Sequence, residues 1–236
     1  GSLILCIIYL KYLNISFWGK HTGLLISRGV IGTISMALFF LTIKEIPFGS
    51  AVTLRYLSPI FAGLLAMYWL KEKITSLQWL FFITAFIGVV MLKGFDPRVT
   101  ILGLVLILFS ALFSGVVYVI IRKIGTREHP AVVVLYFMIC ATIIGGLLSI
   151  FHWNTPNMRD WIILLSLGVF GFIGQIYMTK AYQIASIGYV APMKYIESVF
   201  ALLLGWIWFD EAYGIWSLFG IAIIVGSMLL NIILKK

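Results

Sequence analysis

The sequence predicts an all-α polytopic membrane protein built from two inverted five-helix repeats. Three observations support this fold class. The 236 residues are 62% hydrophobic and only 11% charged, whereas a soluble domain is nearer about half apolar and about a quarter charged. The chain divides into apolar runs of membrane-spanning length. It also matches itself when it is shifted by 139 residues.

Eight apolar runs approach the length that a helix needs to cross a bilayer, roughly 20 residues. A ninth, shorter run opens the chain at Ser2–Leu10. The linkers are short and polar, and most of the eight Trp lie at the ends of runs, where aromatic rings settle at a membrane interface. The eight predicted spans are 22–43, 48–70, 76–93, 100–121, 130–151, 161–183, 187–209 and 214–234.

The internal match aligns Gly29–Glu72 with Gly168–Glu211 without a gap and with twelve identities. Arg55 falls on Lys194 in this alignment. Single identities between apolar helices are weak evidence, but glycines, a Trp and a Glu in one register indicate a true repeat. The identical pairs include Gly29 and Gly168, Tyr56 and Tyr195, Trp69 and Trp208, and Glu72 and Glu211.

The repeat predicts two domains, residues 1–98 and residues 99–236. Residues 101–139 have no counterpart in the first repeat, so we expect an intact protein with ten helices, of which about nine are present here. Five helices per repeat would insert the two halves in opposite directions, which is the common plan of secondary transporters.

The net charge of +9 comes from basic residues scattered over short loops. This distribution indicates the cytoplasmic loop bias of membrane proteins and excludes a nucleic-acid-binding stripe. With the N terminus inside, nine Lys and Arg fall on the cytoplasmic side and four on the outer side. We therefore expect a multi-pass protein of the cytoplasmic (inner) membrane, in contact with the lipid bilayer, with both termini in the cytoplasm.

The sequence offers no chemistry for an enzyme. Cys6 and Cys140 lie in apolar runs, and the three His form no cluster with them, so neither a disulfide nor a metal site is predicted. No P-loop and no nucleophile elbow occurs. We expect no catalytic residues, no metal and no cofactor.

The stretch "SAVTLRYLSPIFAGLLAMYWLKEKITSLQWLFFITAFIGVVML" resembles the first-repeat signature of the EamA family of the drug/metabolite transporter superfamily. The stretch "QIYMTKAYQIASIGYVAPMKYIESVFALLLGWIWFDE" resembles the second-repeat signature. The resemblance covers nearly the whole chain from Leu24. The "AP-x-x-Y-x-E" run and "SRG" at Ser27–Gly29 are most similar to metabolite carriers, including S-adenosylmethionine uptake carriers. The signature motifs of nucleotide-sugar and triose-phosphate carriers are not found in the sequence.

This resemblance implies a ten-helix carrier with a central cavity. In such carriers the cavity is lined mainly by helices one, three and four of the first repeat and by their symmetry mates.

Arg55 and Lys194 are the sharpest candidates for substrate contact. An ionisable group inside a bilayer costs a few kcal/mol and usually faces a partner or a water-filled cavity. Each of the two is followed by a tyrosine, Tyr56 or Tyr195, and a twofold axis would place them across one cavity. Two cations there would favour a substrate with a carboxylate or phosphate. The alternative is structural, with Lys194 paired to Glu197 at i,i+3 and Arg55 extending to an interface.

Three further candidates lie in the stretch "QIYMTKAYQ". Lys180 either caps the cytoplasmic mouth or extends to the interface. Gln175 and Tyr177 precede it but face different ways, and we expect Arg28 to be an interface anchor. The predicted substrate-binding residues are Arg55, Tyr56, Gln175, Tyr177, Lys180, Lys194, Tyr195 and Glu197.

Other polar and small residues suggest how the helices end and pack. Glu72 and Glu211 end matching runs, where a carboxylate opposes the helix dipole, so they are either exposed termini or packing and gate residues. Pro59 and Pro192 free backbone carbonyls inside their runs, which permits kinks where a cavity is lined. Five glycines are expected to allow close helix approach, namely Gly29, Gly32, Gly168, Gly171 and Gly174.

Together these observations predict a secondary transporter that moves a small polar metabolite, anionic or zwitterionic, by alternating access. Glu197 would be either a proton-coupling group or a counter-ion for Lys194. Two other functions remain open: an exporter of amino acids or hydrophobic cations, and a non-transporting membrane scaffold or channel subunit. The sequence leaves the substrate, the direction of transport, the coupling ion and the oligomeric state undetermined.

Overall fold

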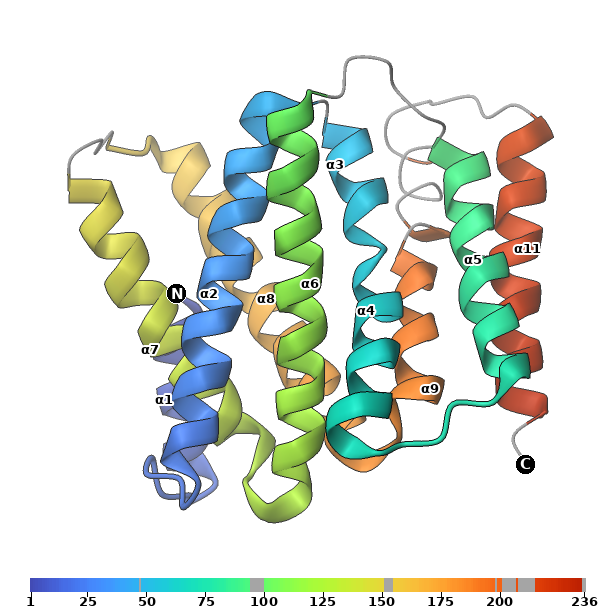
Figure 1. The fold of residues 1–236 in the computed structure, drawn as a ribbon. Helices are drawn as coiled ribbons and strands as arrows, with labels where there is room; N and C mark the ends of the chain where they lie inside the picture. The colour runs from blue at the N-terminus through green and yellow to red at the C-terminus, as the bar shows by residue number, and fades with distance from the viewer. Residues whose placement is uncertain are drawn as a thin grey trace. The chain divides into compact units, whose positions relative to one another are not determined.

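A computed structural model describes residues 1–46, 48–93, 100–150, 155–197, 199–200, 207 and 215–234. Every regular element in these ranges is helical, which confirms the predicted all-α class (Figure 1). The elements are α1 (Ser2–Tyr12), α2 (Thr22–Glu45), α3 (Phe48–Arg55), α4 (Ser58–Leu65), η1 (Ala66–Leu70), α5 (Ser76–Lys93), α6 (Ile101–Ile124), η2 (Gly125–Arg127), α7 (Pro130–Ser149), α8 (Met158–Ile184), α9 (Ile187–Val190), η4 (Ala191–Tyr195) and α11 (Ile215–Ile233).

The chain forms two compact units. The first consists of Gly1–Ile34 and Ile120–Ala185, and the second of Ser35–Val119 and Ser186–Lys236. Helices α2 and α6 each contribute one end to each unit. Each unit therefore combines segments from both of the repeats that the sequence predicts.

Four described helices are long and apolar enough to cross a membrane. They are Thr22–Glu45, Ile101–Arg127, Pro130–Ser149 and Met158–Ile184. The predicted spans 48–70 and 187–209 are largely helical where the structure describes them, but neither is one uniform α-helix. The first run is divided into α3, α4 and η1, and the described part of the second begins with the short elements α9 and η4.

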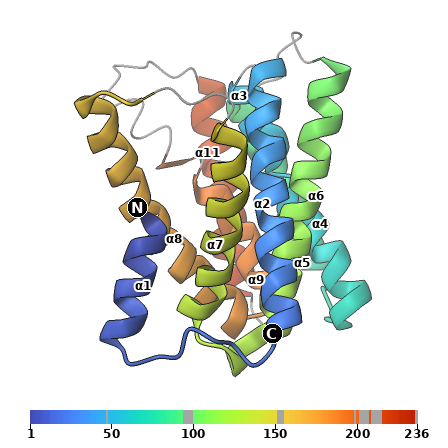
Figure 2. The same cartoon turned by 90° about the vertical axis from the view of Figure 1, so that its left-hand side faces the viewer.

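In the first unit, α1, α7 and α8 pack against one another. Figure 2 shows α1 reaching α8 close to the N terminus. There the Ser2 hydroxyl donates a hydrogen bond of 2.9 Å to the Gly168 carbonyl. The Cys6 thiol donates to the Ala131 carbonyl of α7 at 3.4 Å, so side chains of α1 bond to the backbones of both neighbouring helices.

Gly29 allows α2 to lie close to α7 in the same unit. A Cβ at Gly29 would lie 2.7 Å from Cys140 Sγ and 2.9 Å from the Tyr136 carbonyl oxygen, so a side chain there would push the helices apart. One turn later, a Cβ at Gly32 would lie 3.2 Å from the Phe137 ring. The predicted close approach is confirmed at both glycines.

The other three glycines of that prediction lie on α8. A Cβ at Gly168 would meet the Ser2 nitrogen at 3.4 Å, which is ordinary contact. At Gly171 and Gly174 no described atom lies within 4 Å of the same position. Within the described residues the prediction is therefore wrong for these two, because α8 presents them to no neighbour there.

In the second unit, α5 and α11 form a close pair. A Cβ at Gly88 would lie 2.9 Å from the Gly220 carbonyl oxygen. The Thr84 and Ser227 hydroxyls are hydrogen-bonded at 2.8 Å. Small residues and a hydroxyl pair thus join two apolar helices, as they commonly do in membrane proteins.

Hydroxyl groups also join α2 to α6 within the second unit. Ser35 Oγ donates to the Ser110 carbonyl and Ser110 Oγ donates to the Ser35 carbonyl, both at 2.8 Å. Ser114 Oγ lies 2.8 Å from Ser35 Oγ. This reciprocal bonding satisfies buried hydroxyls without charge.

Candidate functional site

Two runs that the sequence predicts as spans are interrupted in the second unit. In the first run, α3 ends at Arg55 and a short turn leads into α4. In the second run, α9 gives way to the 3₁₀ helix η4, which ends at Tyr195. The interruptions fall on Arg55–Tyr56 and Lys194–Tyr195, the positions that the internal repeat aligns. Discontinuous membrane helices expose helix ends and backbone, and transporters use them to bind solutes.

Prolines explain both interruptions. Pro59 lies in the first turn of α4 and Pro192 in the first turn of η4. Proline has no N–H, so the carbonyl four residues earlier loses its helical donor. For Pro192 that carbonyl belongs to Gly188, and it accepts a hydrogen bond of 3.2 Å from the Asn231 amide on α11. The predicted kinks are confirmed, and a side chain of another helix replaces the missing bond at one of them.

Tyr56 and Tyr195 meet at the interruptions. Their ring centroids lie 5.9 Å apart at an interplanar angle of 50°. Both side chains are buried, and they belong to one core cluster with Ala85, Val199 and Ile224. Matching residues of the two predicted repeats thus form a direct contact.

Charged groups lie next to this tyrosine pair. Lys194 Nζ lies 2.5 Å from Glu197 Oε1, and the Glu197 side chain is 57% exposed. The Arg55 guanidinium is half-buried and stacks over the Phe39 ring, 4.4 Å from its centroid. Arg55 and Lys194 are each adjacent in sequence to one of the two tyrosines in contact. The structure therefore brings together five of the eight predicted residues, and Arg55 packs on an aromatic ring instead of extending to an interface.

This cluster of Arg55, Tyr56, Lys194, Tyr195 and Glu197 combines two cations, one carboxylate and two aromatic walls. Guanidinium and ammonium groups bind carboxylates and phosphates by charge-assisted hydrogen bonds. The carboxylate neutralises one cation, which leaves a net positive charge. The arrangement is suited to binding an anionic group.

The remaining predicted residues lie in the first unit. Gln175 Oε1 accepts a hydrogen bond of 2.7 Å from Arg28 Nη2. Arg28 is only 1% exposed, and its guanidinium lies 4.1 Å from the Phe137 ring centroid. The prediction of Arg28 as an interface anchor is therefore wrong, because its charge is held inside the unit by an amide and an aromatic face.

Gly32 is the sequence signal that could have located Arg28. The position of a Cβ at Gly32 lies 3.4 Å from Arg28 Nη1. Residues four apart share one helix face, so a glycine one turn after an arginine leaves room for the guanidinium to fold back along the helix.

Tyr177 and Lys180 line a cavity of about 500 Å³ in the first unit. The cavity lies among α1, the start of α7 and α8. Its other lining residues are Tyr9, His129, Pro130, Phe172, Ile173 and Ile176.

Glu72 contacts the backbone at the start of α9. Its Oε2 accepts a hydrogen bond of 3.0 Å from the Ile187 N–H. Lys71 ends η1 in the left-handed conformation, with φ of 54°, directly before Glu72. The packing role predicted for Glu72 is confirmed, since its carboxylate satisfies a helix N terminus. Glu211, the matching residue, lies outside the described residues.

Among the described residues, no group of three His, Cys, Asp or Glu side chains could hold a metal ion. Cys6 is buried and Cys140 half-buried, and both are free thiols.

The sequence was also compared with those of known protein families and proteins. Residues 1–93 and 101–233 match the model of the EamA-like transporter family. The chain is 29% identical over 213 residues to the pseudopaline exporter CntI of Pseudomonas aeruginosa, covering 89% of this chain and 75% of that protein. It is 30% identical over 218 residues to the riboflavin transporter of Brucella anthropi, covering 89% of this chain and 76% of that protein.

Two further likenesses extend this picture. The human solute carrier family 35 member G1 is 29% identical over 241 residues, covering 95% of this chain and 66% of that protein. A crystal structure with 17% sequence identity superposes with a TM-score of 0.84, covering 99% of this chain and 84% of the other. That last likeness shows a shared fold.

Proposed function

Because the chain belongs to the EamA-like transporter family, we propose that it is a secondary transporter whose substrate carries a carboxylate or phosphate group. The family and the named relatives support a multi-pass membrane protein that transports small metabolites. Those relatives differ in the compound they carry, so their names do not choose a substrate for this chain. The substrate class proposed here depends on the charged cluster.

The single observation that carries the proposal is the pair of cations at aligned helix interruptions. Arg55 and Lys194 each precede one of the two tyrosines whose rings lie 5.9 Å apart, so two cations flank one contact. Keeping two cations close together in a membrane protein is costly unless an anion accompanies them. Glu197 supplies one negative charge at 2.5 Å from Lys194. A carboxylate or phosphate on the substrate would supply a second.

The exposure of Glu197 supports a water-filled space beside the cluster. More than half of its side chain is exposed while it pairs with Lys194. A carboxylate that faced lipid tails would pay a desolvation cost of a few kcal/mol. We therefore infer that the exposed face of the pair lines an aqueous cavity, and that Tyr56 and Tyr195 form its apolar wall.

The Tyr56–Tyr195 contact supports the inverted-repeat interpretation. An axis that relates two repeats must pass between equivalent residues that touch. In alternating access one repeat would rock against the other around that site. Movement about this contact would expose the cations to each side of the membrane in turn.

Glu197 is proposed either to couple transport to protons or to act as counter-ion for Lys194 in the empty site. Glu197→Gln separates these roles. Loss of proton-driven uptake with retention of solute exchange would assign coupling. Retention of both, with tighter binding of the anion, would assign the counter-ion role, because the substrate would no longer compete with a carboxylate.

The test is counterflow in proteoliposomes, after a thermal-shift screen of carboxylates and phosphates has identified a ligand. Lys194→Ala and Arg55→Ala should each weaken binding of that ligand, since a charged hydrogen bond contributes about 1.5–3 kcal/mol, or roughly tenfold to 100-fold. Lys123→Ala, an exposed cation in the first unit, is the matched control and should leave binding unchanged. Unchanged counterflow in all cluster variants would refute the site. Counterflow of hydrophobic cations alone would favour a drug-type exporter, and no counterflow of any solute would favour a scaffold.

A further inference from the structure

The cavity of about 500 Å³ in the first unit has a charged end and an apolar wall. Its charged end is formed by Lys180, four residues before the end of α8, and it adjoins His129, which caps the start of α7. Of the described side chains that line it, none carries a carboxylate. The Lys180 charge is therefore not neutralised by an acid inside the cavity.

His129 adds a neutral donor. Its Nδ1 accepts a hydrogen bond of 3.2 Å from the Ala131 N–H, as an N-cap. Burial, and secondly the charge of Lys180, lower the pKa of His129. A neutral imidazole that accepts at Nδ1 carries its proton on Nε2 and donates there. Tyr9 and Tyr177 line the same space.

The wall is a stripe along α8. Phe172, Ile173, Ile176, Tyr177 and Lys180 recur at helical spacing on one side of the helix. From residue 172 to residue 180 the helix rises about 12 Å. Tyr9 packs edge-on against Phe172, with centroids 5.8 Å apart, and closes the far end of the stripe. An apolar wall of this length would add nothing to the binding of a small water-soluble anion, whereas an acyl chain would bury apolar surface against it.

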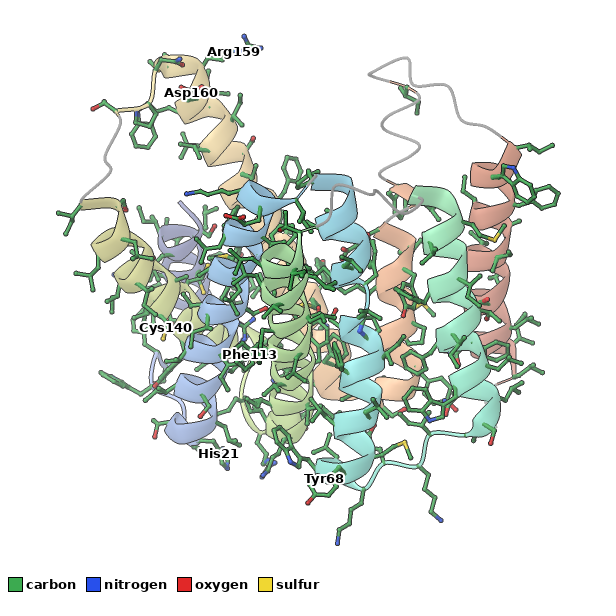
Figure 3. The ribbon with its side chains drawn as sticks, turned by 45° about the horizontal axis from the view of Figure 1, so that its top comes forward. His21, Tyr68, Phe113, Cys140, Arg159 and Asp160 are labelled. Atoms are coloured by element: carbon green, nitrogen blue, oxygen red, sulfur yellow. The ribbon has the colours of Figure 1, made fainter. Side chains whose placement is uncertain are left out.

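The charged end of the cavity lies at the basic end of its unit. Figure 3 shows Arg159 and Asp160 at one end of the unit and His21 at the other. His21 precedes α2, at the end where α1 and α8 finish and α7 starts. Five further cations lie near those termini, whereas Arg159 is at the opposite end: Lys11, Lys20, Arg122, Lys123 and Arg127. An excess of Lys and Arg marks the cytoplasmic side, where the leaflet is rich in anionic lipids.

We propose that this cavity binds an anionic phospholipid of the cytoplasmic leaflet, with the phosphate on Lys180 Nζ and His129 Nε2 and an acyl chain along the α8 stripe. Tyr177 and Lys180 are then lipid ligands instead of substrate ligands. Lipid binding at this cavity requires only that the chain lies in a membrane, and it does not depend on the substrate proposed for the charged cluster.

Native mass spectrometry of the detergent-purified chain tests the site with three probes: phosphatidylglycerol, phosphatidylcholine and glycerol phosphate. The wild type should retain phosphatidylglycerol at least threefold better than phosphatidylcholine. Lys180→Gln should abolish this preference, and Lys180→Arg should keep it. Lys123→Gln, which removes an exposed cation at the same end of the unit but outside the cavity, should leave it intact.

Three outcomes would overturn the proposal. Equal retention of phosphatidylglycerol by the wild type and Lys180→Gln would show that Lys180 does not bind the phosphate. An equal loss in Lys180→Gln and Lys123→Gln would show general attraction to a basic surface. Binding of glycerol phosphate as tight as that of the lipid would show a site for a soluble phosphate, for which the apolar stripe is irrelevant.

Discussion

His129 performs two tasks with one imidazole: it caps α7 and faces the cavity that holds Lys180. Burial and the Lys180 charge lower its pKa from the ordinary value of 6.5. The unfolded chain therefore binds this proton more readily than the folded protein. The neutral side chain contributes stability above pH 6.5, and that contribution is lost as the pH falls from there through the folded pKa.

We expect the apparent melting temperature in neutral detergent to fall between pH 7.5 and pH 5.5, and His129→Asn to reduce that fall. Asparagine keeps an acceptor for the Ala131 N–H but does not titrate. All other ionisable groups are the same in both proteins, so the difference between the two profiles isolates His129. Identical profiles would contradict this prediction, because they would show that protonation of His129 does not change the free energy of unfolding.

One contact that the structure shows follows from spacing within a single helix. Lys194 and Glu197 are three apart, so their ion pair follows from helix geometry alone. Arg28 differs, because its partner Gln175 lies 147 residues away and Phe137 belongs to another helix. Gly32, one turn after Arg28, indicates room for the guanidinium, but no local pattern encodes the two distant partners, and the sequence therefore places Arg28 at an interface although it is buried.

At the scale of the elements, the packing of α2 against α7 depends on the absence of a side chain at Gly29. Gly29→Ala places a methyl group 2.7 Å from Cys140 Sγ and 2.9 Å from the Tyr136 carbonyl oxygen. Overpacking of this kind typically costs about 1–3 kcal/mol. We expect an apparent melting temperature several degrees lower, measured by tryptophan fluorescence in detergent.

Gly23→Ala is the matched control on the same helix. No described atom lies within 4 Å of a Cβ at Gly23. Alanine is the better helix former by about 1 kcal/mol, so this variant should be as stable as the wild type or more so. Equal destabilisation by both changes would mean that the helix itself, not its contact with α7, is sensitive.

The interruption at η4 depends on a bond between elements. Asn231→Ala removes the donor to the Gly188 carbonyl and should cost about 1 kcal/mol. Pro192→Ala restores a backbone N–H four residues after Gly188. In that background the loss from Asn231→Ala should shrink, because the carbonyl has a new donor.

A double-mutant cycle of unfolding in a denaturing detergent measures this coupling. A loss of the same size in both backgrounds would show that Asn231 stabilises α11 by packing and not through the freed carbonyl.

The positions of the elements follow from sequence, but their interruptions follow only in part. Hydropathy places the apolar runs near the observed helices, since about 20 residues must cover the bilayer. The prolines indicate kinks at Pro59 and Pro192. Whether a kink becomes a break depends on what satisfies the freed backbone. At η4 that partner is Asn231, which the sequence gives no reason to connect with Gly188.

At the scale of the whole molecule, the distribution of charge predicts how the protein crosses the membrane. In a background in which Cys6 and Cys140 are alanine, Arg159→Cys should react with a membrane-impermeant maleimide on intact cells. Lys123→Cys should react only after permeabilisation, because its end of the unit carries the excess of cations. The opposite pattern would place both termini outside and move the lipid cavity to the outer leaflet.

The second unit also constrains how the protein is made. It joins Ser35–Val119 to Ser186–Lys236, and its α5 is paired with α11 through Thr84 and Ser227, 143 residues apart. A nascent chain that has inserted α5 must therefore leave the face at Thr84 and Gly88 without its packing partner until the ribosome delivers residues 215–233. During that interval the half-made protein depends on the insertion machinery for protection. Premature stop codons anywhere before α11 should accordingly produce chains that membrane proteases remove, even though most helices are already present.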